Sequence, residues 1–407
     1  AAGVGFAAWW PNLGDMQFGE PVVLFTQPWS DATVYFSILL GDFSGDGVLD
    51  LYLPPVTDAD SPPGTDGIPV PFRRFEGTTD GFIELEPLDP LVNLVSVGTD
   101  RDLDGDLDIL AWSDRMAPTV FYQNIGGNPP KFVDDAPAIG ATLTLAGMGM
   151  DGRDVNGDGY PDYCVTDVGP PLCLASDGVG GWYEAARSWG LDPKVPIHQW
   201  ASTVGWSFEF VDFENDGWTD VVQCSAPHND MAEDEPEVRF PDLIWQGGTD
   251  GRFTDITDTT SFGDPEYDFG LVATVLDGDG GVDVVVVGPD RTPRLWSNGC
   301  TEGGFLDVEF GGPPGNGAGI GARVRIKAGD FSDTREVYAL RSPMGSPTRL
   351  HFGLGAATTV DDLSIIWPDG YEMTLADFAA NRIVTLVHPT ARPQRHDLSS
   401  PTTDLSA

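Results

Sequence analysis

A nine-residue acidic pattern recurs along this chain, with oxygen-bearing side chains at positions 1, 3, 5 and 9 and glycine at position 6. Four such side chains crowded into one turn repel one another unless a hard cation lies between them. Ca²⁺ fits best, because it accepts about six to eight oxygens in a flexible shell. The glycine allows the sharp turn that points the carbonyl of position 7 inward. The predicted ligands of the four full-length copies are Asp42, Ser44, Asp46, Val48 and Asp50; Asp100, Asp102, Asp104, Asp106 and Asp108; Asp154, Asn156, Asp158, Tyr160 and Asp162; and Asp212, Glu214, Asp216, Trp218 and Asp220.

A fifth copy reads as two residues shorter and offers fewer ligands, which are Asp277, Asp279 and Asp283. The alternative interpretation is a set of solvated acidic turns, but recurrence in matching contexts favours calcium, at about four to five ions. Magnesium is disfavoured because it demands a stricter octahedron. The pattern is not an EF-hand, since position 12 is never glutamate and an apolar, strand-like run follows position 9.

The spacing of the copies predicts the fold. Their first aspartates lie 54 to 65 residues apart, a period typical of solenoids, propellers and arrays. Each period holds several short β-rich runs separated by turn residues, which is the content of a propeller blade. We therefore expect an all-β chain with a β-propeller of five to seven blades. One short helical turn is expected, over Leu375 to Ala380.

Two resemblances support this expectation. The acidic loops resemble the FG-GAP/VCBS repeats of integrin α-subunit propellers, and the phrase from Gly248 to Thr257 is similar to one that follows the blade in that family. Residues 319–326, 349–355 and 360–370 resemble the ASPIC/UnbV domain of cartilage-acidic-protein-like and many bacterial secreted proteins. The family implies a propeller, commonly of seven blades, over residues 1–310, followed by a small β domain over 315–388. The Pro/Ser/Thr-rich remainder, 389–407, is expected to be a flexible tail.

Composition indicates the compartment and excludes some partners. The formal net charge is −43, and five Ca²⁺ ions would leave about −33. Nucleic acid is excluded because its recognition needs a basic footprint. No run approaches the ~18 apolar residues of a membrane span. Calcium loops suit an extracellular setting, so we expect a secreted or cell-surface protein whose export signal is not part of this sequence.

The four cysteines are consistent with export. Cys164 and Cys173 flank a tight turn and could bridge neighbouring strands, which would leave Cys224 and Cys300 as the second pair. Four cysteines allow three pairings, so the connectivity stays open. Four buried free thiols are the alternative.

The sequence offers few candidates for catalytic groups. The five histidines are scattered without a His-Glu-x-x-His pair. The run Gly315–Gly321 resembles a dinucleotide loop but enters a strand rather than a helix. A ligand surface could instead involve the loop His228–Glu237 or the tryptophans outside the acidic loops, which are Trp9, Trp10, Trp29, Trp189, Trp200 and Trp206.

The leading hypothesis is therefore a secreted, calcium-stabilised propeller that binds a protein, matrix or glycan ligand. Each ion would stiffen a strand turn while surface loops recognise the ligand. The alternative is a carbohydrate- or natural-product-acting enzyme, of the lyase or dehydratase kind, with its site in the propeller channel or on a face. A third possibility is a structural subunit of a cell-surface complex, marked by a large flat apolar patch.

Overall fold

The computed structural model describes residues 4–14, 17–28, 33–35, 37–57, 70–91, 93–114, 116–192, 203–227, 241–263, 267–289, 291–299, 303–339, 347–391 and 403–404. Several predicted features lie outside these ranges: Trp29, Trp200, Cys300, the loop His228–Glu237 and most of the tail. The described part is all-β, as predicted, with three short helical turns. No helix of the described residues is long and apolar enough to cross a membrane.

Five antiparallel sheets each carry one acidic loop, which joins the first strand to the second. The second strand always begins at position 9 of the pattern, so the prediction that a strand follows the loop is confirmed. Strands pair in sequence order, as expected for propeller blades. The sheets are β6 Leu39–Gly41, β7 Asp50–Leu53, β9 Val70–Thr78 and β10 Gly81–Leu91; β11 Asn93–Thr99, β12 Asp108–Ser113, β14 Val120–Asn124 and β15 Phe132–Asp134; β17 Met150–Arg153, β18 Asp162–Asp167, β19 Gly169–Ser176 and β20 Trp182–Glu184; β21 Thr203–Val211, β22 Asp220–Pro227, β23 Leu243–Gly247 and β24 Phe253–Asp255; and β25 Gly270–Thr274, β26 Asp283–Val287 and β27 Arg294–Trp296.

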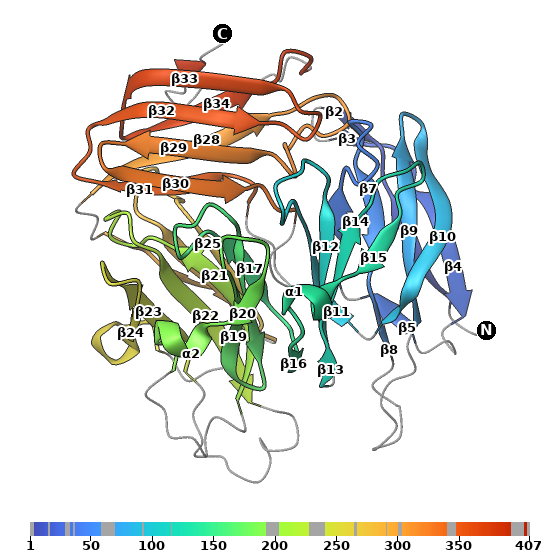
Figure 1. The fold of residues 1–407 in the computed structure, drawn as a ribbon, viewed down its shortest axis with the longest axis horizontal. Coiled ribbons are helices and arrows are strands. Elements are labelled where there is room, and N and C mark those ends of the chain that lie inside the picture. The colour runs from blue at the N-terminus through green and yellow to red at the C-terminus, as the bar shows by residue number, and fades with distance from the viewer. Residues whose placement is uncertain are drawn as a thin grey trace.

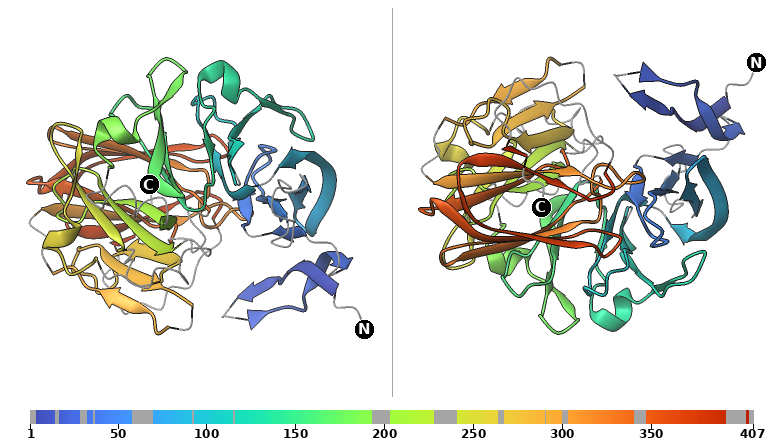
Figure 2. Two further views of the ribbon diagram at one scale, coloured as in Figure 1. Left: turned by 90° about the horizontal axis from the view of Figure 1, so that it is seen from below. Right: turned by 90° about the horizontal axis from the view of Figure 1, so that it is seen from above.

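The sheets follow one another around a common centre (Figure 2). First strands of successive sheets contact each other, β6 with β11, β17 with β21, and β21 with β25. Hydrophobic side chains fill the space between neighbouring sheets. One such core joins Trp112 and Phe121 of the second sheet to Tyr163 and Leu174 of the third. Burial of these large apolar side chains is the main force that holds the sheets together.

Short elements surround the five sheets. The ribbon of β1 Val4–Trp9 and β4 Val22–Pro28 packs against the first sheet through Phe25 and Phe75. Among the described strands, β1 and β4 pair with each other and with no loop-bearing sheet. Whether they belong to a further blade, and with it the number of blades, therefore stays a prediction. The remaining elements are the paired strands β2 Asn12–Gly14 and β3 Gln17–Phe18, β5 Thr33–Tyr35 and β8 Pro55–Thr57, and β13 Ala117–Pro118 and β16 Thr144–Leu145, with the helices α1 Ala136–Ile139, α2 Ala186–Trp189 and η1 Thr257–Thr259.

The C-terminal region forms two four-stranded sheets packed face to face. Strand β29 alternates buried and exposed residues, as a half-buried strand should. Buried side chains such as Val324, Phe352 and Trp367 fill the space between the sheets. Residues 375–379, predicted to be helical, instead lie in a strand, because they pair with the neighbouring strand over its whole length. The two sheets are β28 Gly304–Gly311, β31 Leu350–Gly355, β34 Arg382–Val387 and β35 Thr403–Asp404; and β29 Arg323–Ala328, β30 Phe331–Glu336, β32 Thr359–Ile366 and β33 Glu372–Ala379.

The five loop-bearing sheets are called the ring below. The C-terminal sandwich lies across the ends of ring sheets (Figure 1). The acidic loops all lie at the ends where β6, β11, β17, β21 and β25 finish. These loops and the strand ends before them contact the sandwich, as where β17 meets β30. The sandwich therefore covers part of one face of the ring, and the first sheet and the N-terminal ribbon lie beside it (Figure 2).

Candidate metal centres and the cleft beside them

The first four acidic loops have an aspartate at position 1 and are called complete loops here. In each of them the position 1 carboxylate accepts at least one hydrogen bond from the backbone of its own loop. In the first loop, Asp42 accepts hydrogen bonds from the backbone N–H groups of Asp46, at 3.0 Å, and Gly47, at 2.7 Å. These bonds curl the chain around the carboxylate, so that the side chains of positions 3 and 5 face the same region. The same bonds join Asp154 to Asp158 and Gly159, Asp212 to Asp216 and Gly217, and Asp100 to Gly105.

The backbone conformation explains the glycine at position 6. Gly47, Gly105, Gly159 and Gly217 all have φ between 86° and 97°, a region that side chains with a Cβ rarely adopt. The backbone at position 4 is also in the left-handed region. In the fourth loop this position is Asn215, with φ of 58°. Asparagine tolerates this conformation better than most residues.

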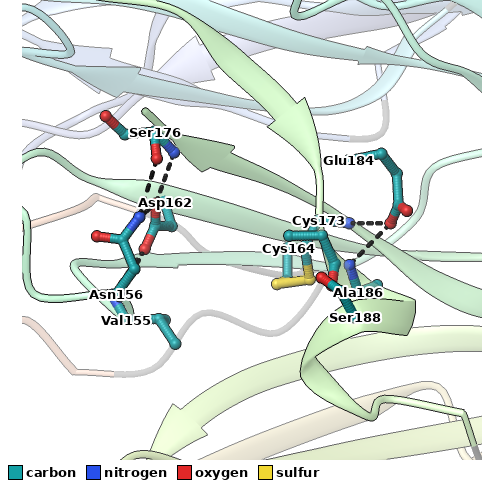
Figure 3. Close-up of a disulfide and its surroundings, with 10 residues drawn as sticks. Val155, Asn156, Asp162, Cys164, Cys173, Ser176, Glu184, Ala186 and Ser188 are labelled. Carbon is teal, nitrogen blue, oxygen red and sulfur yellow. Dashed lines mark hydrogen bonds between the residues drawn. A yellow bond between two sulfur atoms is a disulfide. The ribbon is translucent and has the colours of Figure 1, made fainter. Parts of the chain in front are cut away.

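The carboxylate at position 9 ties the loop to its sheet (Figure 3). Asp162 accepts hydrogen bonds through Oδ2 from the N–H of Val155, at 2.8 Å, and through Oδ1 from the N–H of Ser176, at 2.7 Å. Ser176 is the last residue of the third strand, so one side chain joins the loop to that strand. The equivalent bonds link Asp50 to Gly77, Asp108 to Asn124, Asp220 to Gly247 and Asp283 to Asn298.

The fifth loop has a different register from the one expected. Thr274 pairs with Asp283, just as Gly41 pairs with Asp50 in the first sheet. The loop therefore runs from Val275 to Asp283 and is as long as the others, with Asp277 at position 3 and Asp279 at position 5. Position 1 is Val275, which is buried in an apolar core. The expected shortening was wrong, and the ligand that this loop lacks is the position 1 carboxylate.

In each of two loops, three carboxylates lie close enough together to bind one cation. Within the described residues, ligand oxygens of Asp100, Asp102 and Asp104 lie within 4.8 Å of one another, and so do those of Asp212, Glu214 and Asp220. Four buried oxygens at predicted ligand positions have no hydrogen-bond partner: Ser44 Oγ, Asp100 Oδ1, Asp102 Oδ1 and Asp108 Oδ2. Asp108 Oδ2 is ion-paired with Arg101 Nε at 3.2 Å. A buried oxygen without a partner is costly. A hard cation would satisfy these atoms, so the donor set fits Ca²⁺.

Burial also raises the pKa of the position 9 carboxyls of the first four loops. The pKa is about 7 for Asp50 and Asp162, about 8 for Asp108 and about 9 for Asp220. At Asp220 the neighbouring Glu214 carboxylate raises the pKa further. At Asp108 the guanidinium of Arg101, with Nε 3.2 Å from Oδ2, acts in the opposite direction. A cation in these loops would favour the ionised carboxylates and remove this penalty.

The sandwich contacts the fourth loop through a chain of polar groups. His351 lies between two of them, with Nε2 2.7 Å from Asn215 Oδ1 and Nδ1 2.8 Å from Asp307 Oδ1. The N–H of Gly355 donates to the Asn215 carbonyl at 2.8 Å. A Cβ on Gly353 would lie 1.9 Å from Asp212 Oδ2, so only glycine allows the strand to approach the carboxylate this closely.

Other loops meet the sandwich in different ways. At the second loop, Thr99 Oγ1 and the N–H of Asp100 both donate to the Glu336 carboxylate, at 2.7 and 3.0 Å. Beside the third loop, Arg153 donates to Asp333 at 2.8 Å. At the fifth loop, the ring of Phe305 packs against Gly280, where a Cβ would meet it at 2.2 Å.

A cleft of about 410 Å³ opens where the third and fourth loops face the β29–β30 hairpin. A second hollow, of about 490 Å³, shares Asp154, Gly157, Ser332 and Asp333 with it, so the two form one groove. Its walls include Trp218, which is 42% exposed, and Phe331. The acidic pattern did not reveal this groove, because it forms only when two loops and a hairpin more than 100 residues away come together.

The groove changes the interpretation of the predicted residues. Trp218 was expected to contribute only its carbonyl, but its side chain lines the groove. Of the tryptophans suggested as a ligand surface, Trp10 is exposed, whereas Trp9, Trp189 and Trp206 are buried or half-buried. The carbonyls of Val48, Asp106, Tyr160 and Trp218 stay predicted ligands.

The structure contains one disulfide, between Cys164 and Cys173. These residues face each other on β18 and β19, as the turn between them indicated (Figure 3). The second predicted pair is wrong, since Cys224 carries a free buried thiol. Burial raises the pKa of that thiol and makes it unreactive.

Comparison with known proteins identifies the C-terminal domain. Residues 312–393 match the family model described as ASPIC and UnbV, which confirms that resemblance. No curated protein matches the chain.

Similar solved structures include an Agrocybe aegerita lectin that recognises non-reducing terminal N-acetylglucosamine, with 13% identity and a TM-score of 0.36, covering 72% of this chain and 75% of that one. The V. cholerae biofilm matrix protein Bap1 has 13% identity and a TM-score of 0.34, covering 85% of this chain and 58% of that one. The rhamnogalacturonan lyase YesX has 11% identity and a TM-score of 0.36, covering 94% of this chain and 76% of that one. At these values the alignments carry no functional argument.

Proposed function

We propose that this protein is a secreted binding module whose FG-GAP-like β-propeller is stabilised by four Ca²⁺ ions. The observation that carries the proposal is the presence of buried oxygens without partners, Ser44 Oγ, Asp100 Oδ1 and Asp102 Oδ1, at predicted ligand positions. These atoms lie in the first and second loops, where an ion would coordinate them. The third and fourth loops carry the same ligand positions, so an ion in each complete loop would offset the repulsion between its carboxylates. The fifth loop is assigned no ion, because Val275 stands where the position 1 carboxylate is needed.

The role of the ions in this proposal is structural. Each loop joins the first two strands of a sheet and is tied to the third by the position 9 carboxylate. Fixing the loop therefore fixes the sheet. The loops also support the sandwich, through contacts such as that between Asn215 and His351. The ligand would be a protein, matrix component or glycan, and the groove beside the third and fourth loops supplies a place for it. Catalysis on a carbohydrate or natural product is the alternative use of that groove.

The test is metal content together with thermal stability. After equilibrium dialysis against millimolar Ca²⁺, the level at which extracellular modules bind, elemental analysis should find about four calcium ions per chain above the content of the surrounding buffer. A strong chelator should lower Tm substantially, and added Ca²⁺ should restore it. Asp104→Asn, in the second loop, should lose about one ion, whereas the matched variant Asp279→Asn, in the fifth loop, should lose none. A melting curve that the chelator leaves unchanged would refute the structural role.

A further inference from the structure

We propose that the groove between the third loop, the fourth loop and the β29–β30 hairpin binds a neutral saccharide, with the Trp218 indole as the surface on which a sugar ring stacks. The inference rests on the proposed binding function and names the ligand class and the site. The first hollow, at about 410 Å³, falls within the range of about 300–1,000 Å³ that is usual for small-ligand sites.

Trp218 differs from most of the tryptophans that the structure describes. Trp112, Trp245 and Trp367 are fully buried, whereas Trp218 is 42% exposed. Its backbone is held in place, because its N–H donates to Asp216 Oδ1 at 2.8 Å. An indole presented to solvent on a fixed loop offers a flat apolar face and an N–H donor. Those two features suit a pyranose ring, which has an apolar C–H face and a rim of hydroxyl groups.

Five exposed polar side chains line the first hollow with Trp218: Asn156, Asp216, Arg252, Asp330 and Ser332. Together they offer donors and acceptors for sugar hydroxyls. Much of the remaining wall is glycine backbone, from Gly217, Gly247, Gly248 and Gly251. Glycine walls provide no apolar pockets for the side chains of a peptide, so the composition favours a saccharide over a protein segment.

The charges of the groove favour a neutral sugar. Asp333 is already paired, with Arg153 at 2.8 Å and Arg335 at 3.0 Å. Asp154 uses its oxygens to accept backbone N–H groups of its own loop. Asp216 also lines the first hollow, but it is a predicted calcium ligand and its Oδ1 accepts the N–H of Trp218. The other exposed charges of the first hollow are those of Arg252 and Asp330, one of each sign. An acidic saccharide would also face the net charge of −43 of the whole chain.

The experiment uses the full chain with Ca²⁺ present. The probes are an immobilised panel of neutral and uronic-acid oligosaccharides, both free and attached to a carrier protein, followed by calorimetry with the best neutral oligosaccharide. Wild type should bind neutral sugars in preference to acidic ones. Trp218→Ala should weaken binding roughly tenfold or more, as expected for an aromatic side chain that the ligand covers when it binds. Trp218→Phe should retain part of the affinity. The matched control is Trp10→Ala, which removes the other tryptophan that is exposed among the described residues and should bind as wild type does.

The outcomes separate this inference from the proposed function. The same variants are melted with Ca²⁺ and with chelator. If calcium stabilises all of them but no neutral oligosaccharide binds wild type, the saccharide site is wrong while the calcium-stabilised module stands. Equal binding by Trp218→Ala and Trp10→Ala, or preference for uronic acids, would likewise overturn the inference. If calcium has no effect on Tm, the proposed function itself fails.

Discussion

Replacing Gly353 by alanine should loosen the contact between the fourth loop and the C-terminal sandwich. The new Cβ would lie 1.9 Å from Asp212 Oδ2 and 2.7 Å from the Cα of Asn215. Both atoms belong to a loop fixed by backbone hydrogen bonds, so the strand and the loop must move apart. Overpacking of this kind costs about 1–3 kcal/mol.

The displacement should also weaken two hydrogen bonds. These are the bond between His351 and Asn215, at 2.7 Å, and the bond from Gly355 to the Asn215 carbonyl, at 2.8 Å. Each is worth about 1 kcal/mol net, which brings the total loss to about 3–5 kcal/mol. For 407 residues unfolding as one unit, this corresponds to a fall in Tm of roughly 3–6 °C.

The assay is calorimetric melting of Gly353→Ala with Ca²⁺ and with chelator. Gly317→Ala is the matched control, because a Cβ there would meet nothing within 4 Å. Since Asp212 is a predicted ligand, Gly353→Ala should also reduce the difference in Tm between the calcium-loaded and chelated protein. If Gly353→Ala melts like Gly317→Ala in both conditions, the packing of the sandwich on this loop is not what the structure indicates.

Two further predictions concern the third loop and the second. Asp158→Ala should lower Tm measurably in Ca²⁺, because it removes a predicted ligand and the bond to the N–H of Tyr160 at 2.9 Å. The control Asp80→Ala, in an exposed turn, should melt as wild type does. Equal Tm values for the two variants would mean that the third loop holds no ion. Burial raises the pKa of Glu336 from 4.5 to about 7. The contribution of Glu336 to the free energy of unfolding is therefore most favourable below pH 4.5. It falls by on the order of 3 kcal/mol as pH rises through 7. Glu336→Gln should gain stability relative to wild type between pH 5 and pH 8, and a difference in Tm that does not change with pH would contradict this.

The acidic pattern predicted much of the architecture because its residues act locally. Asp50 and Asp162 bond to groups within seven residues of themselves, and the strand begins at the carboxylate itself. Such short-range contacts can be seen in the order of the residues. The motif of the ASPIC and UnbV domain was equally local, and the family model confirmed it.

Other features could not be predicted because they depend on distant or apolar partners. The bond between Thr99 and Glu336 joins residues 237 positions apart, and no local pattern marks it. The register of the fifth loop was misread because Val275, at position 1, carries no oxygen and does not fit an acidic pattern. The short apolar run from Leu375 was ambiguous between helix and strand, and pairing with β32 decided it.

The bond from each position 9 aspartate to the third strand should make each sheet of the ring open and close as one unit. In every loop-bearing sheet, one carboxylate connects the turn between the first two strands to a backbone N–H at the end of the third or just beyond it. Opening the turn therefore releases the third strand as well. Amide exchange should accordingly report whole sheets gaining and losing protection as blocks, with the loops setting the rate for strands that they do not adjoin in sequence.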